Sequence, residues 1–80
     1  MLSELESSKK VVGTKQAKKA LIKDEVDLLY IADNADKIIT DELVQIAEEK
    51  SVRVIKIKSM EELGKACGID VSAASVARLK

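Results

Sequence analysis

Two segments of this 80-residue chain combine residue types that could do chemistry. In the first, a glycine-threonine pair precedes a run of lysines. A glycine turn that enters a helix leaves free backbone N–H groups at the positive end of the helix dipole, and such a terminus binds anions. Lysine adds phosphate affinity there, and lysine and glutamine can reach nucleic-acid base edges. The candidate residues of this segment are Gly13, Thr14, Lys15, Gln16, Lys18 and Lys19. The alternative is ordinary helix capping.

The second segment begins where Gly68 is well placed to end a helix. It continues as a loop of small and apolar residues that cannot all be buried. An exposed apolar loop beside a basic helix start suits an unstacked base or a sharply bent nucleic-acid backbone. The alternative is that Ile69 and Val71 close the edge of the core. The candidate residues of this segment are Ile69, Asp70, Val71, Ser72, Ala73 and Ala74.

Catalytic residues are harder to find. The chain has no histidine, which removes the commonest general base and most metal-site patterns. Cys67 has no histidine to activate it and shares an apolar stripe with Leu63, so core packing is the expected role. Asp33 and Asp36 could form an acid/base pair or a magnesium site, but turn formation or helix capping also explains them. We therefore expect no enzyme activity, no metal and no cofactor.

The net charge is zero, but the charges are segregated along the chain. Residues 9–23 hold six lysines and no acid, residues 24–49 hold nine acids and one lysine, and residues 50–58 are basic again. Such polarity matters to an anionic partner, although solvated helix faces can also be basic or acidic without further meaning. A second hypothesis is a small protein-interaction module whose acidic helix over 41–49 docks a basic partner. Reversal of Lys19 would test nucleic-acid binding, and changes at Glu48 and Glu49 would test docking.

The hydrophobic pattern predicts the elements that position these residues. Strands are expected over 10–12, 26–32, 52–58 and 76–79, with the second covered on both faces. Helical segments are expected over 2–8, 14–23, from Asp36 onward and from Ser59 onward, the last with a Ser59–Glu62 capping box. The expected inner residues of the three longer helices are Ala17, Ala20 and Leu21; Ile39, Leu43, Ile46 and Ala47; and Met60, Leu63 and Cys67. This alternation predicts an α/β fold, a three-layer α/β/α sandwich with a small, mostly four-stranded mixed sheet, as one domain over 1–80.

The chain shows no membrane or export signal. Its longest uncharged apolar run, Leu28 to Ala32, is five residues, whereas a bilayer span needs about 20. The N-terminus lacks a basic-then-apolar leader, and one cysteine cannot form an internal disulfide. We expect a monomer in the cytoplasm.

The stretches GTKQAKKAL and LGKACGIDVSAASVA, with IADNAD between them, resemble the ribosomal protein family L-seven-Ae, specifically its short bacterial members. The similarity runs from Val11 to Ala77. The resemblance implies an α/β/α sandwich that binds RNA kink-turns, which are sharply bent duplexes with tandem sheared G·A pairs beside a bulge. The helix start would enter the widened major groove at the G·A pairs, and the second loop would cover the bulge. The implied partner is structured RNA, either ribosomal RNA or a regulatory element, or the ribosome itself.

Carried over by residue, the resemblance places Gly13 and Thr14 at the turn facing RNA and Lys19 at the G·A region, with residues 69–74 on the bulge. Archaeal and eukaryotic relatives have Asn and Glu where this chain has Lys15 and Gln16, a variation that bacterial members share. Loss of the Glu acceptor removes charge-assisted hydrogen bonds to guanine amino groups. This implies about 1–3 kcal/mol less discrimination against altered G·A pairs and a steeper salt dependence.

Overall fold

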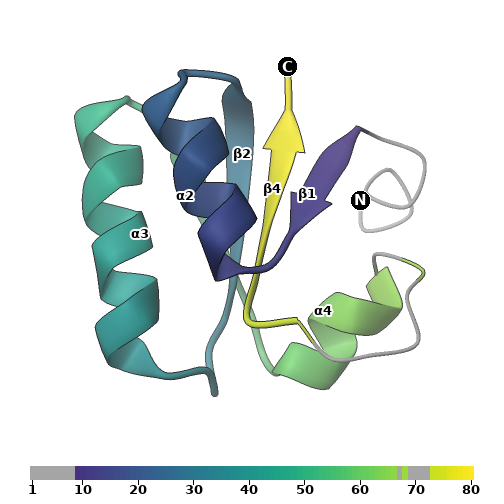
Figure 1. Ribbon diagram of the computed structural model, residues 1–80. Coiled ribbons are helices and arrows are strands. Elements are labelled where there is room, and N and C mark those ends of the chain that lie inside the picture. The colour runs from purple at the N-terminus through teal and green to yellow at the C-terminus, as the bar shows by residue number, and fades with distance from the viewer. Residues whose placement is uncertain (1–8, 67, 69–72) are drawn as a thin grey trace.

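The computed structural model describes residues 9–66, 68 and 73–80 (Figure 1). Every expected strand is present in this part of the chain, as are the helices expected after Gly13, Asp36 and Ser59, with ends that differ by at most two residues. The helical turn expected over 2–8 lies outside the described residues, as does Cys67. The elements are β1 (Lys10–Val12), α2 (Thr14–Ile22), β2 (Val26–Ala32), α3 (Lys37–Glu49), β3 (Arg53–Ile57), α4 (Met60–Ala66) and β4 (Ser75–Leu79).

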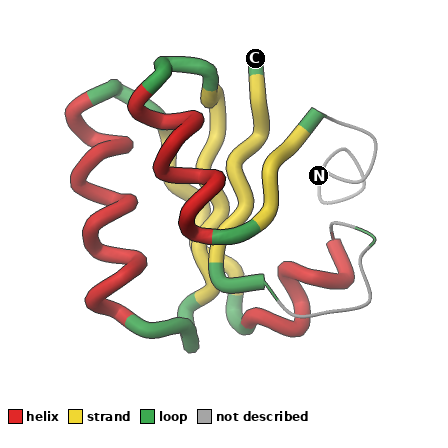
Figure 2. Tube along the Cα trace, in the orientation of Figure 1, coloured by secondary structure: helices red, strands yellow, loops and turns green. Residues whose placement is uncertain are grey.

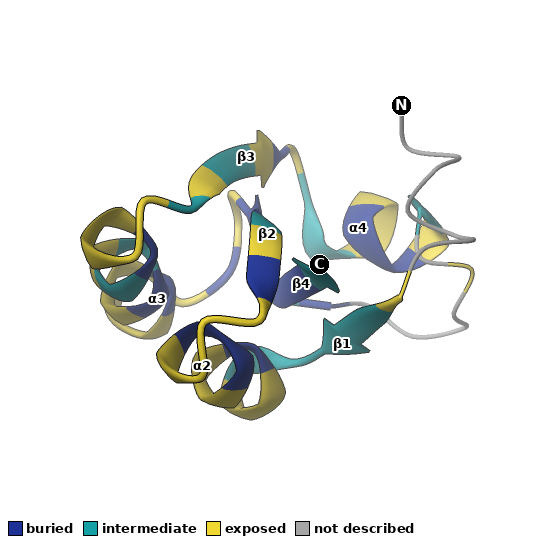
Figure 3. Cartoon of the chain, turned by 90° about the horizontal axis from the view of Figure 1, so that it is seen from above, coloured by how far each residue is buried: buried dark blue, intermediate teal, exposed yellow. Residues whose placement is uncertain are grey.

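The four strands form one mixed sheet in the order β1-β4-β2-β3. β2 and β3 are parallel, and β4 is antiparallel to both of its neighbours. Helices α2 and α3 cover one face of the sheet, and α4 lies on the other, as the view from above makes clear (Figure 3). This confirms the three-layer α/β/α sandwich. Within the described residues, no helix combines the length and apolar character that a membrane crossing requires.

Strand β2 connects the two halves of the core. Its residues Leu29 to Ala32 are all buried, because helices cover both sides of the sheet. Alternate side chains point to opposite faces. Tyr30 and Ala32 join the cluster beneath α4, whereas Leu29 and Ile31 join the cluster beneath α2 and α3. The uninterrupted apolar run therefore indicated a strand covered on both faces, and this expectation is confirmed.

Helix α2 buries the three expected residues, Ala17, Ala20 and Leu21. The expected inner stripe of α3 is wrong at its first member, since Ile39 is 42% exposed and Thr40 is buried in its place. The Thr40 hydroxyl donates to the carbonyl oxygen of Lys37 at 3.4 Å within the same helix. This hydrogen bond within the helix lowers the free-energy cost of burying a polar side chain. The buried face of α3 therefore begins at Thr40, one residue later than the apolar pattern predicted.

Candidate nucleic-acid interface

The first predicted segment forms the start of α2. Gly13 is its N-cap residue, with φ 103° and ψ 152°, a backbone conformation that is essentially restricted to glycine. No side chain caps this start, and its first turn contains no acidic residue. The first N–H groups of any helix have no partner within the helix. The N–H groups of the residues that follow Gly13 in the first turn are therefore available to an external acceptor, and side-chain capping does not account for the Gly-Thr pair.

The other two helices in the described part of the chain begin differently. The Asp36 carboxylate accepts a hydrogen bond from the backbone N–H of Ile38 at 3.0 Å and so caps α3. At α4, the Ser59 hydroxyl accepts from the N–H of Glu62 at 3.2 Å, which agrees with the expected capping box. Asn34 also accepts from the N–H of Met60 at 2.8 Å. Among the three described helices, α2 is therefore the one that starts without a side-chain cap.

The described end of the second predicted segment, residues 73–74, leads into Ser75, which contacts this start. The backbone N–H of Gly13 donates to the carbonyl oxygen of Ser75 at 3.0 Å. The two residues before Ser75 are held by further backbone bonds, from the N–H of Ala73 to Met60 at 3.1 Å and from Ala32 to the carbonyl of Ala74 at 2.9 Å. The loop at Gly13 and the segment 73–74 consequently lie at the same end of the molecule (Figure 2). The predicted site residues Ile69, Asp70, Val71 and Ser72 lie outside the described residues.

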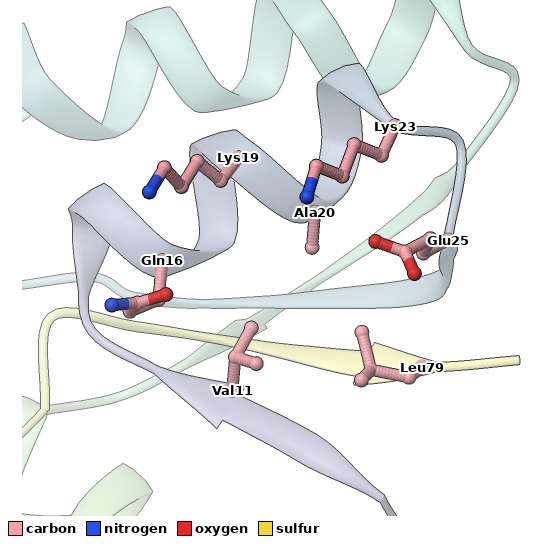
Figure 4. A pocket seen from close by; sticks show the side chains of 7 residues that line it. All are labelled: Val11, Gln16, Lys19, Ala20, Lys23, Glu25 and Leu79. Carbon is pink, nitrogen blue, oxygen red and sulfur yellow. The ribbon is translucent and has the colours of Figure 1, made fainter.

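The polar residues of α2 that were expected at the site point in different directions. Lys15, Gln16, Lys18 and Lys19 are all exposed. The Lys18 ammonium forms a salt bridge with Glu42 of α3, so part of its charge is neutralised. Gln16 and Lys19 instead face away from α3, where they border a hollow above β1 and β4 (Figure 4). The structure therefore separates lysines that are neighbours in the sequence.

Sequence reasoning did not assign two residues that belong to this region. Ser75 receives the hydrogen bond from Gly13, and its role depends on a backbone contact that leaves no sequence signal. Lys23 borders the same hollow as Lys19. Its position was detectable, because the four-residue spacing of Lys15, Lys19 and Lys23 places all three on the outer side of the helix.

Of the residues considered for catalysis, Asp33 and Asp36 are described, and Cys67 lies outside the described residues. Asp36 caps α3, and Asn34 binds the start of α4. Asp33 is exposed, and its backbone N–H donates to Ile57 at 2.7 Å. In the described ranges, no group of three or more His, Cys, Asp or Glu side chains is arranged to hold a metal ion. Asp36 and Asn34 thus act as helix caps, as the alternative of turn formation or helix capping predicted.

Comparison with known proteins agrees with this surface. The family described as ribosomal protein L7Ae/L30e/S12e/Gadd45 matches residues 2–80. An "RNA-binding protein" of Bacillus pumilus is 46% identical over 67 residues, which cover 84% of this chain and 82% of that protein. "RNA-binding protein YbxF" of Geobacillus stearothermophilus is 43% identical over 76 residues, covering 95% and 93%.

A solved structure, the "Giardia lamblia 15.5kD RNA binding protein", superposes with a TM-score of 0.88 at 28% identity. The match covers 99% of this chain and 68% of the Giardia chain. The fold, the match over nearly the whole sequence and the curated relatives agree with one another. The chain belongs to the ribosomal protein L7Ae/L30e/S12e/Gadd45 family.

Proposed function

We propose that this chain is an RNA-binding protein that recognises and stabilises kink-turns through the start of α2 and the segment that follows α4. Membership of the family supports a binding protein rather than an enzyme, and the curated relatives named RNA-binding proteins support RNA as the partner. The natural target would be ribosomal RNA or an RNA regulatory element, bound by a monomer in the cytoplasm.

The observation that carries the proposal is the hydrogen bond from Gly13 to Ser75. It holds the uncapped helix start against Ser75, the residue that follows the second predicted segment, so the backbone N–H donors and lysine ammonium groups of α2 lie close to the end of that segment. A bent RNA presents its G·A pairs and its bulge close together. A surface that fits only this form shifts the RNA population towards it.

The residue types define how such recognition would work. Lys15 and Lys19 supply positive charge that does not distinguish sequences, whereas the Gln16 amide can donate and accept at base edges. With only one aromatic residue, buried Tyr30, the chain has no stacking platform. Binding should therefore depend on backbone contacts, charge and RNA shape, and should weaken steeply as the salt concentration rises.

The test is a titration of the protein into a kink-turn duplex that carries a fluorophore pair reporting the bend. The control is the same duplex with Watson–Crick pairs in place of the G·A pairs. We expect saturable binding and bending of the kink-turn RNA alone. Equal, weak binding to both duplexes that disappears at moderate salt would overturn kink-turn recognition and would favour an interaction module with a non-specific basic patch.

A further inference from the structure

The outer edge of β3 is an open strand edge. β3 is the last strand in the order β1-β4-β2-β3 and pairs with β2 on one side only, and Figure 3 shows it at the margin of the described elements. The carbonyl oxygen of Ile57 accepts from the N–H of Asp33, the residue that follows β2, at 2.7 Å. Backbone groups alternate in direction along a strand, so Ile55 also faces β2, whereas the N–H and C=O groups of Val54 and Lys56 point outward. In the described part of the chain, no strand pairs with these outward groups.

The apolar side chains of this edge are incompletely covered. Val54 packs against the cluster beneath α2 and α3, and Ile55 packs against the cluster beneath α4, but both are only partly buried. Their register partners on β2, Leu29 and Tyr30, are 0% and 1% exposed. A strand added beside β3 would therefore bury more apolar surface on both faces of the sheet, in addition to forming main-chain hydrogen bonds.

The charge of the edge is positive. Its exposed cations are Arg53, Lys56 and Lys58, and no acid lies between them in the sequence. None of the three forms a salt bridge within the described residues. At the end of β3, the lining of a hollow of about 140 Å³ includes two acids, Asp33 and Asp41, and two lysines, Lys37 and Lys56. These four charges cancel in number, so Arg53 and Lys58 leave an excess that favours an anionic occupant.

The chemistry of the edge also decides which kind of chain fits it. A second copy of this chain is disfavoured, because two such edges would place like charges opposite one another. Phosphate groups of a nucleic acid could accept from the outward N–H groups, but they have no hydrogen to donate to the outward carbonyl oxygens. An extended acidic peptide meets both requirements, since its main chain donates and accepts and its carboxylates face the cations.

We propose that the outer edge of β3 binds an extended, acidic segment of another protein, which joins the sheet as a further strand. The backbone of this segment bonds to the outward groups of Val54 and Lys56, and its carboxylates lie against Arg53 and Lys58. The surface is separate from the one at Gly13, because β2 and β4 lie between β3 and β1, and α2 begins directly after β1. This inference does not depend on the proposed function.

The experiment uses the full chain and a synthetic peptide of about eight residues, a common strand length, that alternates glutamate with valine. The control peptide has lysine in place of glutamate. NMR measures the hydrogen exchange of single backbone amides with and without a saturating peptide concentration. The glutamate peptide is expected to slow exchange at Val54 and Lys56 about tenfold or more, because their N–H groups gain acceptors. The amide of Ile55 already faces β2 and should change less.

Two variants separate the backbone pairing from the charge. Val54→Pro removes an outward N–H without changing the charge, and proline is tolerated on edge strands. It should weaken peptide binding about tenfold or more. Lys56→Glu should weaken it about five- to twentyfold, because an attraction becomes a repulsion. The matched control is Lys65→Glu, at an exposed position of α4, which should change peptide binding less than about twofold.

The outcomes distinguish the possible occupants. Equal binding of the lysine peptide, or binding of the glutamate peptide that leaves exchange at Val54 and Lys56 unchanged, would overturn the proposal. Protection of these two amides by duplex RNA and not by the peptide would assign the edge to nucleic acid, and protection that rises with protein concentration alone would assign it to a second copy. Thermal unfolding checks that each variant folds. Kink-turn RNA binding is titrated separately with Val54→Pro, and its loss in the folded variant would contradict two separate surfaces.

Discussion

Helices α2 and α3 lie side by side on one face of the sheet, and both begin at the same end of the molecule (Figure 1). α3 starts at Asp36, whose carboxylate satisfies the N–H of Ile38 and places negative charge at the positive end of the helix dipole. α2 starts at Gly13, with no side-chain cap and no acid in its first turn. An anionic ligand is therefore repelled from one start and attracted to the other, although the two helices are parallel neighbours.

The surfaces of the two helices extend this difference. The exposed residues of α2 include four lysines counting its C-cap residue, whereas α3 exposes Asp41, Glu42, Glu48 and Glu49. One salt bridge, between Lys18 and Glu42, joins the basic face to the acidic one. The acidic helix would keep RNA away from that side of the sheet. Two helices with the same packing role thus present opposite electrostatic surfaces, and the following substitutions test how far the contrast determines function.

The largest effect is expected from Lys19→Glu, which makes the basic face of α2 resemble α3. Loss of a charge-assisted contact and gain of repulsion should cost about 2–3 kcal/mol of binding free energy, or roughly 30- to 150-fold in the dissociation constant for kink-turn RNA. Fluorescence anisotropy of labelled kink-turn RNA measures the dissociation constant. Lys50→Glu changes the net charge equally at an exposed site and should change binding less than about threefold. Equal effects of the two variants would contradict a local contact at Lys19.

A smaller effect, on stability, is expected from Gly13→Ala at the uncapped start. An added Cβ would meet no atom within 4 Å, so the cost is purely conformational. A non-glycine residue at φ 103° and ψ 152° should lower the free energy of unfolding by about 1–3 kcal/mol, measured by urea denaturation.

The control for Gly13→Ala is Asp24→Gly, at a position with φ 63° in the turn after α2. Glycine accepts this conformation readily, so the change in unfolding free energy should stay below about 1 kcal/mol. An unchanged stability in Gly13→Ala would mean that the turn adopts another conformation without cost, and the hydrogen bond to Ser75 would then not define the site.

The smallest effect is expected from removing the cap of α3. Asp36→Ala should lower the free energy of unfolding by about 1 kcal/mol, because the N–H of Ile38 loses its acceptor. Asp36→Asn retains a capping oxygen and should lose much less, so chemical denaturation of the two variants separates the hydrogen bond from the charge. An Asn variant as unstable as the Ala variant would show that the carboxylate acts through its charge.

Local sequence rules predicted most of the fold. The apolar run at 26–32 gave the bounds of β2, and the spacing of Ala17, Ala20 and Leu21 gave the buried side of α2. Such patterns work because helix and strand periods decide which side chains can share a face. The pattern was wrong at Ile39. Apolar residues occur at neighbouring positions around α3, so the sequence allows more than one rotation of the helix about its axis. Packing against the sheet decided that Thr40 is buried instead of Ile39.

The candidate site was only partly predictable. Gly13 and the lysines that follow it predicted the helix start. The role of Asp36 in a helix-capping turn was also predicted. The pairing of Lys18 with Glu42 was not, because it joins residues of different helices whose relative position depends on the sheet. The prediction for residues 69–72 stays a prediction.

By itself, the sequence determined the order of helices and strands, the buried faces of α2 and β2, and the separation of basic from acidic segments. These features follow from side-chain type and short-range spacing, which act within a few residues. Tertiary structure alone decided that Gly13 meets Ser75, that Lys18 faces α3 and that Lys23 shares a hollow with Lys19. The physical reason is that these relations depend on strand order and helix rotation, which are set by packing and hydrogen bonds between residues far apart in the chain.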